Sequence, residues 1–159
     1  MRKFLTCAFV GALLAIGSAA IVAAPAADPA IGKWKLNVAK SKFGPEPVPK
    51  SQVRSYVESA EGLMLTYTNV GTDGKKTAVQ VTYKIDGKDY PATGAPDYDT
   101  VSLKRIDSNN CEFTLKKGGK VVWTGVRSVS ADGKQLTNNF KASSSKSAGY
   151  DIKLLFDRQ

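Results

Sequence analysis

Apolar and polar residues alternate along most of the chain between Ile31 and Phe156. Each alternating run is short and is followed by a segment rich in glycine or other turn-forming residues. Successive side chains of a β-strand point to opposite faces, so this alternation predicts strands with one apolar and one polar face. We count roughly nine or ten such runs, and no segment after the N-terminal one has a helical period.

Three turns between these runs carry the same tripeptide, Asp-Gly-Lys, at residues 73–75, 86–88 and 132–134. Asp-Gly between alternating segments is a strong hairpin signal, because a type I′ turn needs positive φ at both central residues. Consecutive hairpins predict an antiparallel meander. One open sheet of this size would expose a large apolar face, so we expect an up-and-down barrel of about eight to ten strands. An open barrel or a sandwich is the alternative, because the connectors at 39–50 and 90–96 are longer than hairpin turns.

The phase of each run predicts which side chains point into the barrel. Trp34 and Leu36 share one face of the first strand. Several of the residues assigned to the interior are small or polar, namely Ser55, Gly125 and Asn138. Such residues fill little space, which favours some empty volume inside the barrel.

The N-terminal segment has the pattern of a secretory signal peptide. Arg2 and Lys3 precede an uncharged apolar stretch that is too short to span a bilayer comfortably, and small residues follow at 18–20 and 24–26. We therefore assign 1–26 to a signal peptide and 27–159 to a single exported domain, periplasmic or secreted. Cleavage after residue 20 and an uncleaved anchor are the alternatives. Removal of Cys7 leaves Cys111 alone and predicted to be buried, with no intramolecular disulfide.

The composition argues against most enzymes and cofactors. The chain has no histidine, the usual general base and transition-metal ligand, which excludes the common histidine-based catalytic and metal sites. Asp97, Asp99 and Asp107 could suggest a calcium loop, but the downstream glycine and bidentate glutamate of an EF-hand are missing, so we interpret them as solvated loop carboxylates. We therefore expect no catalysis, no metal and no cofactor, although a site of carboxylates, lysine or tyrosine stays formally possible.

The formal net charge of +9 comes from basic residues scattered singly along the chain. They form no arginine-rich run with interleaved aromatic residues, so we expect no nucleic-acid partner. Attraction to an anionic envelope surface fits the charge better. We expect a monomer with no transmembrane segment in the mature chain.

The start of the first strand carries a family resemblance. Gly32-Lys33-Trp34 resembles the Gly-x-Trp opening of lipocalins, and with Lys35 and Leu36 it is also similar to the opening of fatty-acid-binding proteins, the other main calycin branch. The resemblance implies that Trp34 packs across one end of the barrel near a basic residue of the last strand, here Arg158. The Pro-rich connector at 39–50 departs from the helical lid of fatty-acid-binding proteins, because prolines at this spacing interrupt a helix.

A wider resemblance covers most of the domain. The chain is similar to small secreted bacterial proteins of unassigned role in four segments: 34–37, 39–43, 86–91 and 99–107. This resemblance brings no activity with it.

Two arginines are candidates for binding the polar end of a ligand. Arg105 continues the phase of Val101 and Leu103, and Arg127 continues that of Trp123 and Gly125. An inward arginine needs a carboxylate, a tyrosine hydroxyl or a bound anion as partner; escape to solvent at the rim is the alternative. The resemblance implies a ligand carboxylate, since fatty-acid-binding proteins use inward arginines and a tyrosine. The other candidate lining residues are Tyr67, Tyr83, Trp123 and Tyr150.

These observations leave two classes of function. The first is a non-enzymatic carrier or sensor that binds a small hydrophobic or amphipathic molecule inside the barrel. The second is a ligand-free, envelope-associated interaction protein or proteinaceous inhibitor that acts through its surface. We favour the first.

Overall fold

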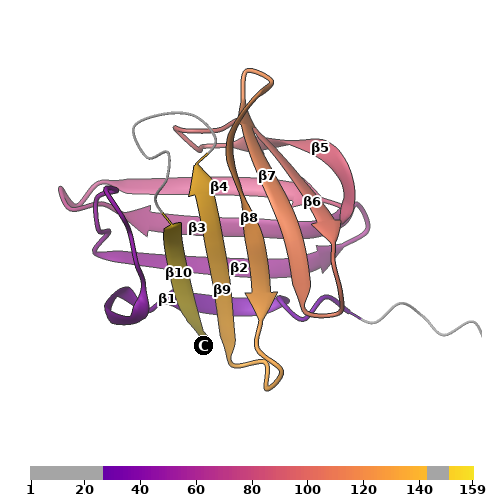
Figure 1. Cartoon of the computed structure of the whole chain (residues 1–159), viewed down its shortest axis with the longest axis horizontal. Coiled ribbons are helices and arrows are strands. Elements are labelled where there is room, and N and C mark those ends of the chain that lie inside the picture. The colour runs from indigo at the N-terminus through magenta and orange to yellow at the C-terminus, as the bar shows by residue number, and fades with distance from the viewer. Residues whose placement is uncertain (1–26, 143–150) are drawn as a thin grey trace, which may run out of the picture.

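The computed structural model describes residues 27–142 and 151–159, which form one closed antiparallel β-barrel (Figure 1). Each strand pairs with the next along the chain, and β1 pairs with β10 to close the ring. This confirms the predicted up-and-down barrel and rules out the sandwich. The ten strands of the described residues are β1 (Gly32–Leu36), β2 (Ser51–Ser59), β3 (Gly62–Val70), β4 (Lys76–Tyr83), β5 (Asp86–Thr93), β6 (Thr100–Arg105), β7 (Asn110–Lys117), β8 (Lys120–Val129), β9 (Gln135–Ala142) and β10 (Asp151–Arg158).

Closure depends on a short ladder between the first and last strands. β1 pairs with β10 only from Trp34, opposite Arg158, to Leu36, opposite Phe156. The chain then leaves the sheet in a three-residue 3₁₀ turn, η1 (Val38–Lys40), and Lys42 forms an isolated bridge with Lys153. The connector at 39–50 has no α-helix, as its prolines predicted.

The Asp-Gly-Lys repeats make tight turns, but not the predicted type I′ turns. In the β3–β4 and β8–β9 connections the glycine amide donates to the carbonyl three residues earlier, Gly74 to Gly71 and Gly133 to Ser130. Each glycine therefore ends its turn instead of sitting at its centre, and its φ is 81° or 69°. In all three repeats the aspartate Oδ1 accepts the lysine amide two residues on, which explains why the tripeptide recurs.

The prediction was wrong for the segment that follows the second repeat. The hairpin expected at this repeat is present, since β4 and β5 are antiparallel neighbours joined at residues 84–85, but Asp86 and Gly87 already belong to β5, where the pairing with β6 shifts register between Asp86 and Asp89. β5 continues through Pro91, in the segment expected to be a loop. It pairs with β4 at only two positions, Gln80–Thr93 and Val81–Ala92. Its side toward β4 therefore behaves largely as a sheet edge, where proline is tolerated.

The predicted phase of β2 was also wrong. Gln52, Arg54 and Tyr56 are buried, whereas Val53 and Val57 are 43% and 47% exposed. Ser55 lies in the same outward phase as the two valines. Short alternation between valine and polar residues does not by itself indicate which face is inward. In this protein the register of β2 with β1 and β3 determines which face of β2 is inward, and it places Arg54 and Tyr56 inside the barrel.

Gly125 does not leave the empty space that its size suggested. A Cβ atom at this position would lie 2.4 Å from Cζ of Phe113, so the aromatic ring already fills the volume. The Phe113 ring packs edge-on against Phe140, with 4.9 Å between centroids, and Phe140 in turn contacts Trp123. This cluster narrows the interior on the side of β7, β8 and β9.

Candidate functional site

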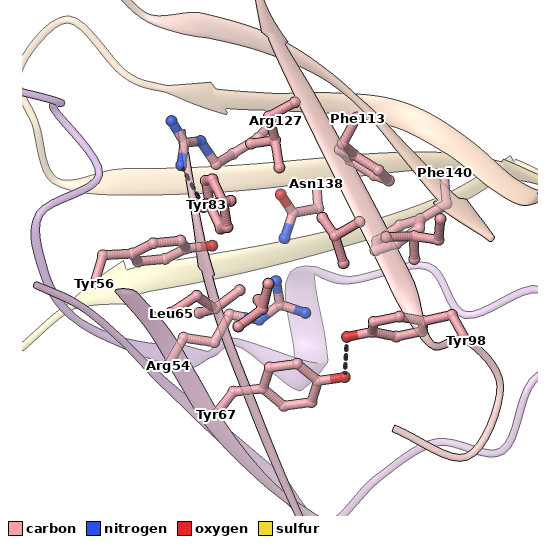
Figure 2. Close-up of a pocket in the computed structure, with 14 residues that line it drawn as sticks. Arg54, Tyr56, Leu65, Tyr67, Tyr83, Tyr98, Phe113, Arg127, Asn138 and Phe140 are labelled. Atoms are coloured by element: carbon pink, nitrogen blue, oxygen red, sulfur yellow. Dashed lines mark hydrogen bonds between the residues drawn. The ribbon is translucent and has the colours of Figure 1, made fainter. Parts of the chain in front are cut away.

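The barrel encloses a small cavity of about 100 Å³ whose wall is mostly apolar but carries several polar groups (Figure 2). It is lined by Arg54, Tyr56, Leu65, Tyr67, Val81, Tyr83, Tyr98, Val101, Leu103, Phe113, Leu115, Arg127, Asn138 and Phe140. These side chains come from β2 to β4 and β6 to β9, together with the β5–β6 connection. A cavity of similar order is known to hold a single small ring.

Arg54, from the middle of β2, is the least compensated charge at the cavity. It is 8% exposed. Its Nε donates to Gln52 Oε1 over 2.8 Å, and its guanidinium carbon lies 4.9 Å and 4.6 Å from the ring centroids of Tyr67 and Phe156. In the described part of the chain no carboxylate forms an ion pair with Arg54. A buried cation held only by an amide oxygen and aromatic faces favours an anion beside it.

Asn138 adds an unused hydrogen-bond donor to the same space. The side chain is 2% exposed, and its Nδ2 has no hydrogen-bond partner in the described structure. Figure 2 shows the Asn138 amide, the Arg54 guanidinium and the Tyr56 hydroxyl turned toward the centre of the cavity. Leaving a buried donor unpaired costs free energy, so these groups are suited to a ligand that brings hydrogen-bond acceptors.

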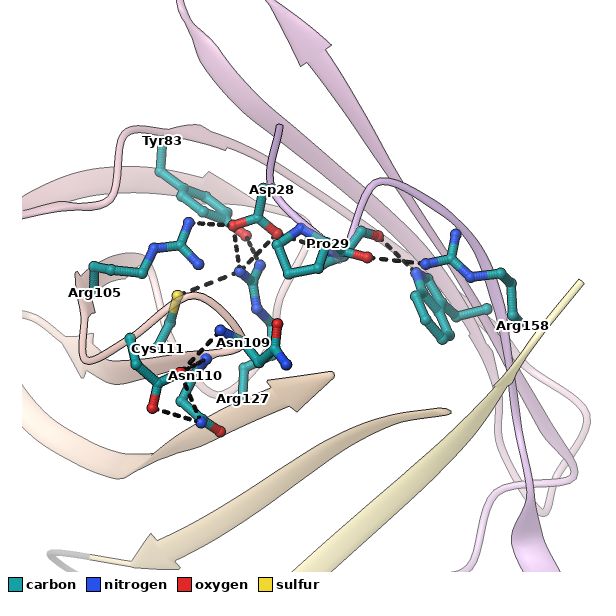
Figure 3. Close-up of polar contacts among 12 residues, drawn as sticks. Asp28, Pro29, Tyr83, Arg105, Asn109, Asn110, Cys111, Arg127 and Arg158 are labelled. Carbon is teal, nitrogen blue, oxygen red and sulfur yellow. Dashed lines mark hydrogen bonds and ion pairs between the residues drawn. The ribbon is translucent and has the colours of Figure 1, made fainter. Parts of the chain in front are cut away.

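At the end of the barrel reached by the last residues of β6 and β8, two arginines share one carboxylate (Figure 3). Asp28, in the segment before β1, accepts hydrogen bonds from Arg127 Nη2 on both oxygens, at 2.9 Å and 2.7 Å, and from Arg105 Nη2. Burial alone would raise the pKa of Asp28, but Arg127, the Ala30 amide and Arg105 together hold it below its ordinary value. Asp28 is therefore ionised near neutral pH and neutralises one of the two guanidinium charges.

Two more groups near Arg127 stay neutral. Arg127 Nη1 donates to the Tyr83 hydroxyl over 3.3 Å, and Nη2 lies 3.4 Å from Cys111 Sγ. Burial raises the pKa of both Tyr83 and Cys111, so neither supplies a negative charge near neutral pH. Cys111 is a free, buried thiol.

A second cavity, of about 250 Å³, lies at the opposite end of the barrel. Its wall is formed by the Pro-rich connector, the β5–β6 connection and inward residues of several strands: Leu36, Phe43, Glu46, Pro47, Pro49, Gln52, Tyr67, Asn69, Thr77, Pro96, Asp97, Trp123, Phe140, Ile152 and Leu154. We call it the mouth. The inner cavity and the mouth share Tyr67 and Phe140. The hydroxyl oxygens of Tyr67 and Tyr98 lie 2.8 Å apart beside this boundary. Burial raises the pKa of both tyrosines, so the pair is neutral.

The structure brings most of the sequence-predicted ligand residues to these cavities. Tyr67, Tyr83 and Arg127 line the inner cavity, and Trp123 lines the mouth. Arg105 lies at the rim with a side chain that is 35% exposed, and it reaches Asp28. Tyr150 lies outside the described residues.

Gly32 and Trp34 of the Gly-x-Trp motif, together with Arg158, lie at one end of the barrel. The Arg158 guanidinium carbon lies 4.2 Å from the Trp34 ring centroid, and Arg158 donates to the carbonyls of Pro29, Ile31 and Gly133. Trp34 is fully buried. A Cβ atom on Gly32 would lie 2.6 Å from Arg158 Nη1, so the glycine makes room for the guanidinium.

Sequence reasoning missed four polar residues of the site: Asp28, Arg54, Tyr56 and Tyr98. The reversed phase of β2 hid Arg54 and Tyr56, and the polar neighbours of Tyr98 suggested an exposed loop. Asp28 stands before the first strand, where alternation gives no information. Arg54 and Tyr56 alternate with valine and serine in the sequence, and this pattern is compatible with either phase, so Arg54 could have been kept as an alternative inward residue.

Two absences concern the described residues only. No group of three or more His, Cys, Asp or Glu side chains is placed to hold a metal ion in residues 27–142 and 151–159. In the same residues, no helix has the length and apolar character needed to cross a membrane.

Comparison with solved structures shows a likeness in fold. No protein-family model matches the chain, and no curated protein matches it. Among solved structures, the zebrafish ileal bile acid-binding protein in complex with cholic acid is similar at a TM-score of 0.49 and 11% sequence identity. The match covers 82% of this chain and 98% of that chain.

Proposed function

We propose that this protein binds a small amphipathic anion inside its barrel, with the anionic group against Arg54 and the apolar part along the aromatic wall toward the mouth. The observation that carries this proposal is the burial of Arg54 at a cavity without an ion-pair partner among the described residues. The described interior arginines and Asp28 together leave an excess of positive charge, which favours an anion over a cation or a neutral molecule.

The ligand is polar at one end and apolar at the other. Arg54, Asn138 and Tyr56 can donate hydrogen bonds to a carboxylate or sulfonate, whereas Leu65 and Val81 offer only apolar contact. The inner cavity holds little more than the polar end and a few attached carbon atoms. A longer ligand extends past Tyr67 and Phe140 into the mouth, which requires the Tyr67–Tyr98 hydroxyl contact to open.

The protein acts, in this proposal, as a binding protein and not as an enzyme. The absence of histidine removes the usual general base, and burial keeps the cavity tyrosines protonated near neutral pH. We also propose that the chain is exported to the periplasm or secreted; the support for this is the charge and hydropathy pattern of residues 1–26.

The test compares two probes that share a ring system and differ in charge: 1-anilinonaphthalene-8-sulfonate and its uncharged analogue N-phenyl-1-naphthylamine. Arg54→Met should weaken binding of the sulfonate about tenfold or more, because it removes a charge-assisted hydrogen bond worth roughly 1.5 to 3 kcal/mol. Binding of the uncharged probe should change little. Fluorescence titration measures both dissociation constants.

Lys35→Met serves as the matched control, because it removes the same charge from an exposed position on β1. Its affinities for both probes should equal those of the parent. Equal loss of both probes in Arg54→Met would mean that the substitution damages the barrel, and unchanged sulfonate binding would contradict the proposed role of Arg54. If the parent binds neither probe, a function through the outer surface becomes the better explanation.

A further inference from the structure

The second arginine cluster, formed by Arg105 and Arg127, has an unusual partner. Both guanidinium groups donate to the carboxylate of Asp28, which belongs to the segment before β1 and to none of the ten described strands (Figure 3). The Asp28 side chain is 8% exposed and that of Arg127 is 3% exposed. A carboxylate attached to a short N-terminal segment thus occupies a buried site built by two strand residues.

This site has more donors than Asp28 can satisfy. Arg105 Nη1 and Arg127 Nε are buried and have no hydrogen-bond partner in the described structure. Two positive charges also face a single negative one, so the cluster keeps an excess positive charge. Unpaired guanidinium nitrogens and excess positive charge are both expected of a site that can bind carboxylate oxygens in more than one arrangement.

Apart from its ion pairs with Arg105 and Arg127, Asp28 is positioned through its own segment, which contacts β1 and β10. Its Oδ1 accepts the Ala30 amide, Ala30 accepts Trp34 Nε1 at 2.7 Å, and Arg158 donates to Pro29. Arg127 also lines the inner cavity, and its guanidinium carbon lies 5.4 Å from the centroid of the Tyr56 ring, which belongs to the same cavity wall.

We propose that Arg105 and Arg127 form a second carboxylate-binding subsite, at the end of the barrel away from the mouth, which Asp28 fills as an exchangeable internal ligand. A free carboxylate competes with Asp28 for the two guanidinium groups. This subsite does not depend on Arg54, and it goes beyond the proposed function because it makes the N-terminal segment responsive to an anion.

Chemical rescue tests the proposal. Asp28→Ala should unfold at a lower temperature than the parent, and acetate should raise its melting midpoint by roughly 3 to 5 °C relative to chloride at equal ionic strength and neutral pH. Acetate should leave the parent nearly unchanged, because Asp28 already fills the subsite. Asp28→Asn should also fail to respond, because its amide occupies the space. Equal acetate stabilisation of parent and Asp28→Ala would overturn the proposal.

Two further variants locate the bound acetate. Adding Arg127→Met to Asp28→Ala should abolish the acetate effect, whereas adding Arg54→Met should preserve it. Persistence without Arg127 overturns the second subsite. Loss without Arg54 places acetate at the first site, which overturns this proposal and leaves the proposed function standing. If Asp28→Ala does not fold in chloride, the refolded yield replaces the melting midpoint, and acetate must restore it only when Arg127 is present.

Discussion

At the scale of single residues, burial and pairing decide the role of each charge in this protein. Arg158 donates hydrogen bonds to three backbone carbonyls and contacts the Trp34 ring, and these contacts stabilise one end of the barrel. Arg127 is paired with Asp28, and Arg54 has no carboxylate partner in the described residues. Arginine therefore has three roles in this protein. Arg158 stabilises one end of the barrel, Arg127 forms a buried ion pair, and Arg54 is a candidate ligand-binding residue.

The Asp28 ion pair predicts a specific acid dependence of stability. The pKa of Asp28 is lowered in the folded protein, so the charged carboxylate contributes stability above its unfolded value, and this contribution is lost as the pH falls through the folded value. At neutral pH, Asp28→Asn should cost on the order of 3 kcal/mol, because it leaves Arg127 buried without its counter-charge. The difference between parent and variant should shrink below about pH 4.

Urea denaturation between pH 3 and 7 measures this difference. Other aspartates with lowered pKa values, Asp86, Asp99, Asp107 and Asp132, are present in both proteins, so their contributions cancel in the comparison. A free-energy difference that stays constant across the whole pH range would contradict the role assigned to the Asp28 charge.

At the scale of secondary-structure elements, glycine has two distinct uses in the barrel. Gly74, in the β3–β4 turn, has a φ of 81°, and a Cβ atom there would meet only the end of the Lys50 side chain, 3.9 Å away. Gly125, within β8, is limited by space: a Cβ atom would lie 2.1 Å from the Asn139 carbonyl oxygen and 2.4 Å from Phe113 Cζ. The first glycine is required by backbone conformation, and the second by the close approach of its neighbours.

Substitution of the two glycines should separate these uses. Gly74→Ala should cost roughly 1 kcal/mol through backbone strain alone, and Gly74→Val somewhat more because valine is β-branched. Gly125→Ala should cost more than Gly74→Ala, because the clash with Asn139 and Phe113 forces the strands apart. Thermal or urea unfolding of the three variants provides the comparison. A Gly125→Ala variant as stable as the parent would show that the β7–β9 aromatic cluster repacks freely.

At the scale of the whole molecule, the barrel is closed but unevenly paired. β7 and β8 share a register of eight residue pairs, whereas β4 and β5 share two and β1 and β10 share three. The β4–β5 boundary is therefore the weakest part of the ring. Because Tyr83 and Val81 of β4 line the inner cavity, separation of these strands would also open the ligand space.

Amide hydrogen exchange should reveal this weakness. Amides at the β4–β5 boundary should exchange faster than those in the centre of β7 and β8, because few ladder hydrogen bonds protect them. An anionic ligand bound in the inner cavity should slow exchange in β4 by mass action on the closed form. Measurement by NMR or mass spectrometry, with and without the sulfonate probe, tests both statements. Uniform protection around the ring would contradict the first statement, and unchanged exchange in β4 with the bound probe would contradict the second.

The sequence by itself determined the class of fold and part of the site. Alternation with a period of two and glycine-marked turns predicted a closed meander, because each strand must bury one face and a ring removes the exposed edges. The phase of β8 placed Arg127 inside for the same local reason. The strand pattern, the turns and the inward phase of β8 depend on residues that are close together in the chain, so they can be predicted from the sequence alone.

Only the tertiary structure decided which charges meet and which remain uncompensated. The inward phase of Arg54 depends on the register of β2 with β1 and β3, and local alternation could not choose it. The pairing of Asp28 with Arg127 joins residues 99 positions apart, and it requires the N-terminal segment to cross the end of the closed ring. The size of the cavity likewise follows from how Phe113, Phe140 and Trp123 fill the space beside Gly125, because packing in a closed barrel is a property of all its strands together.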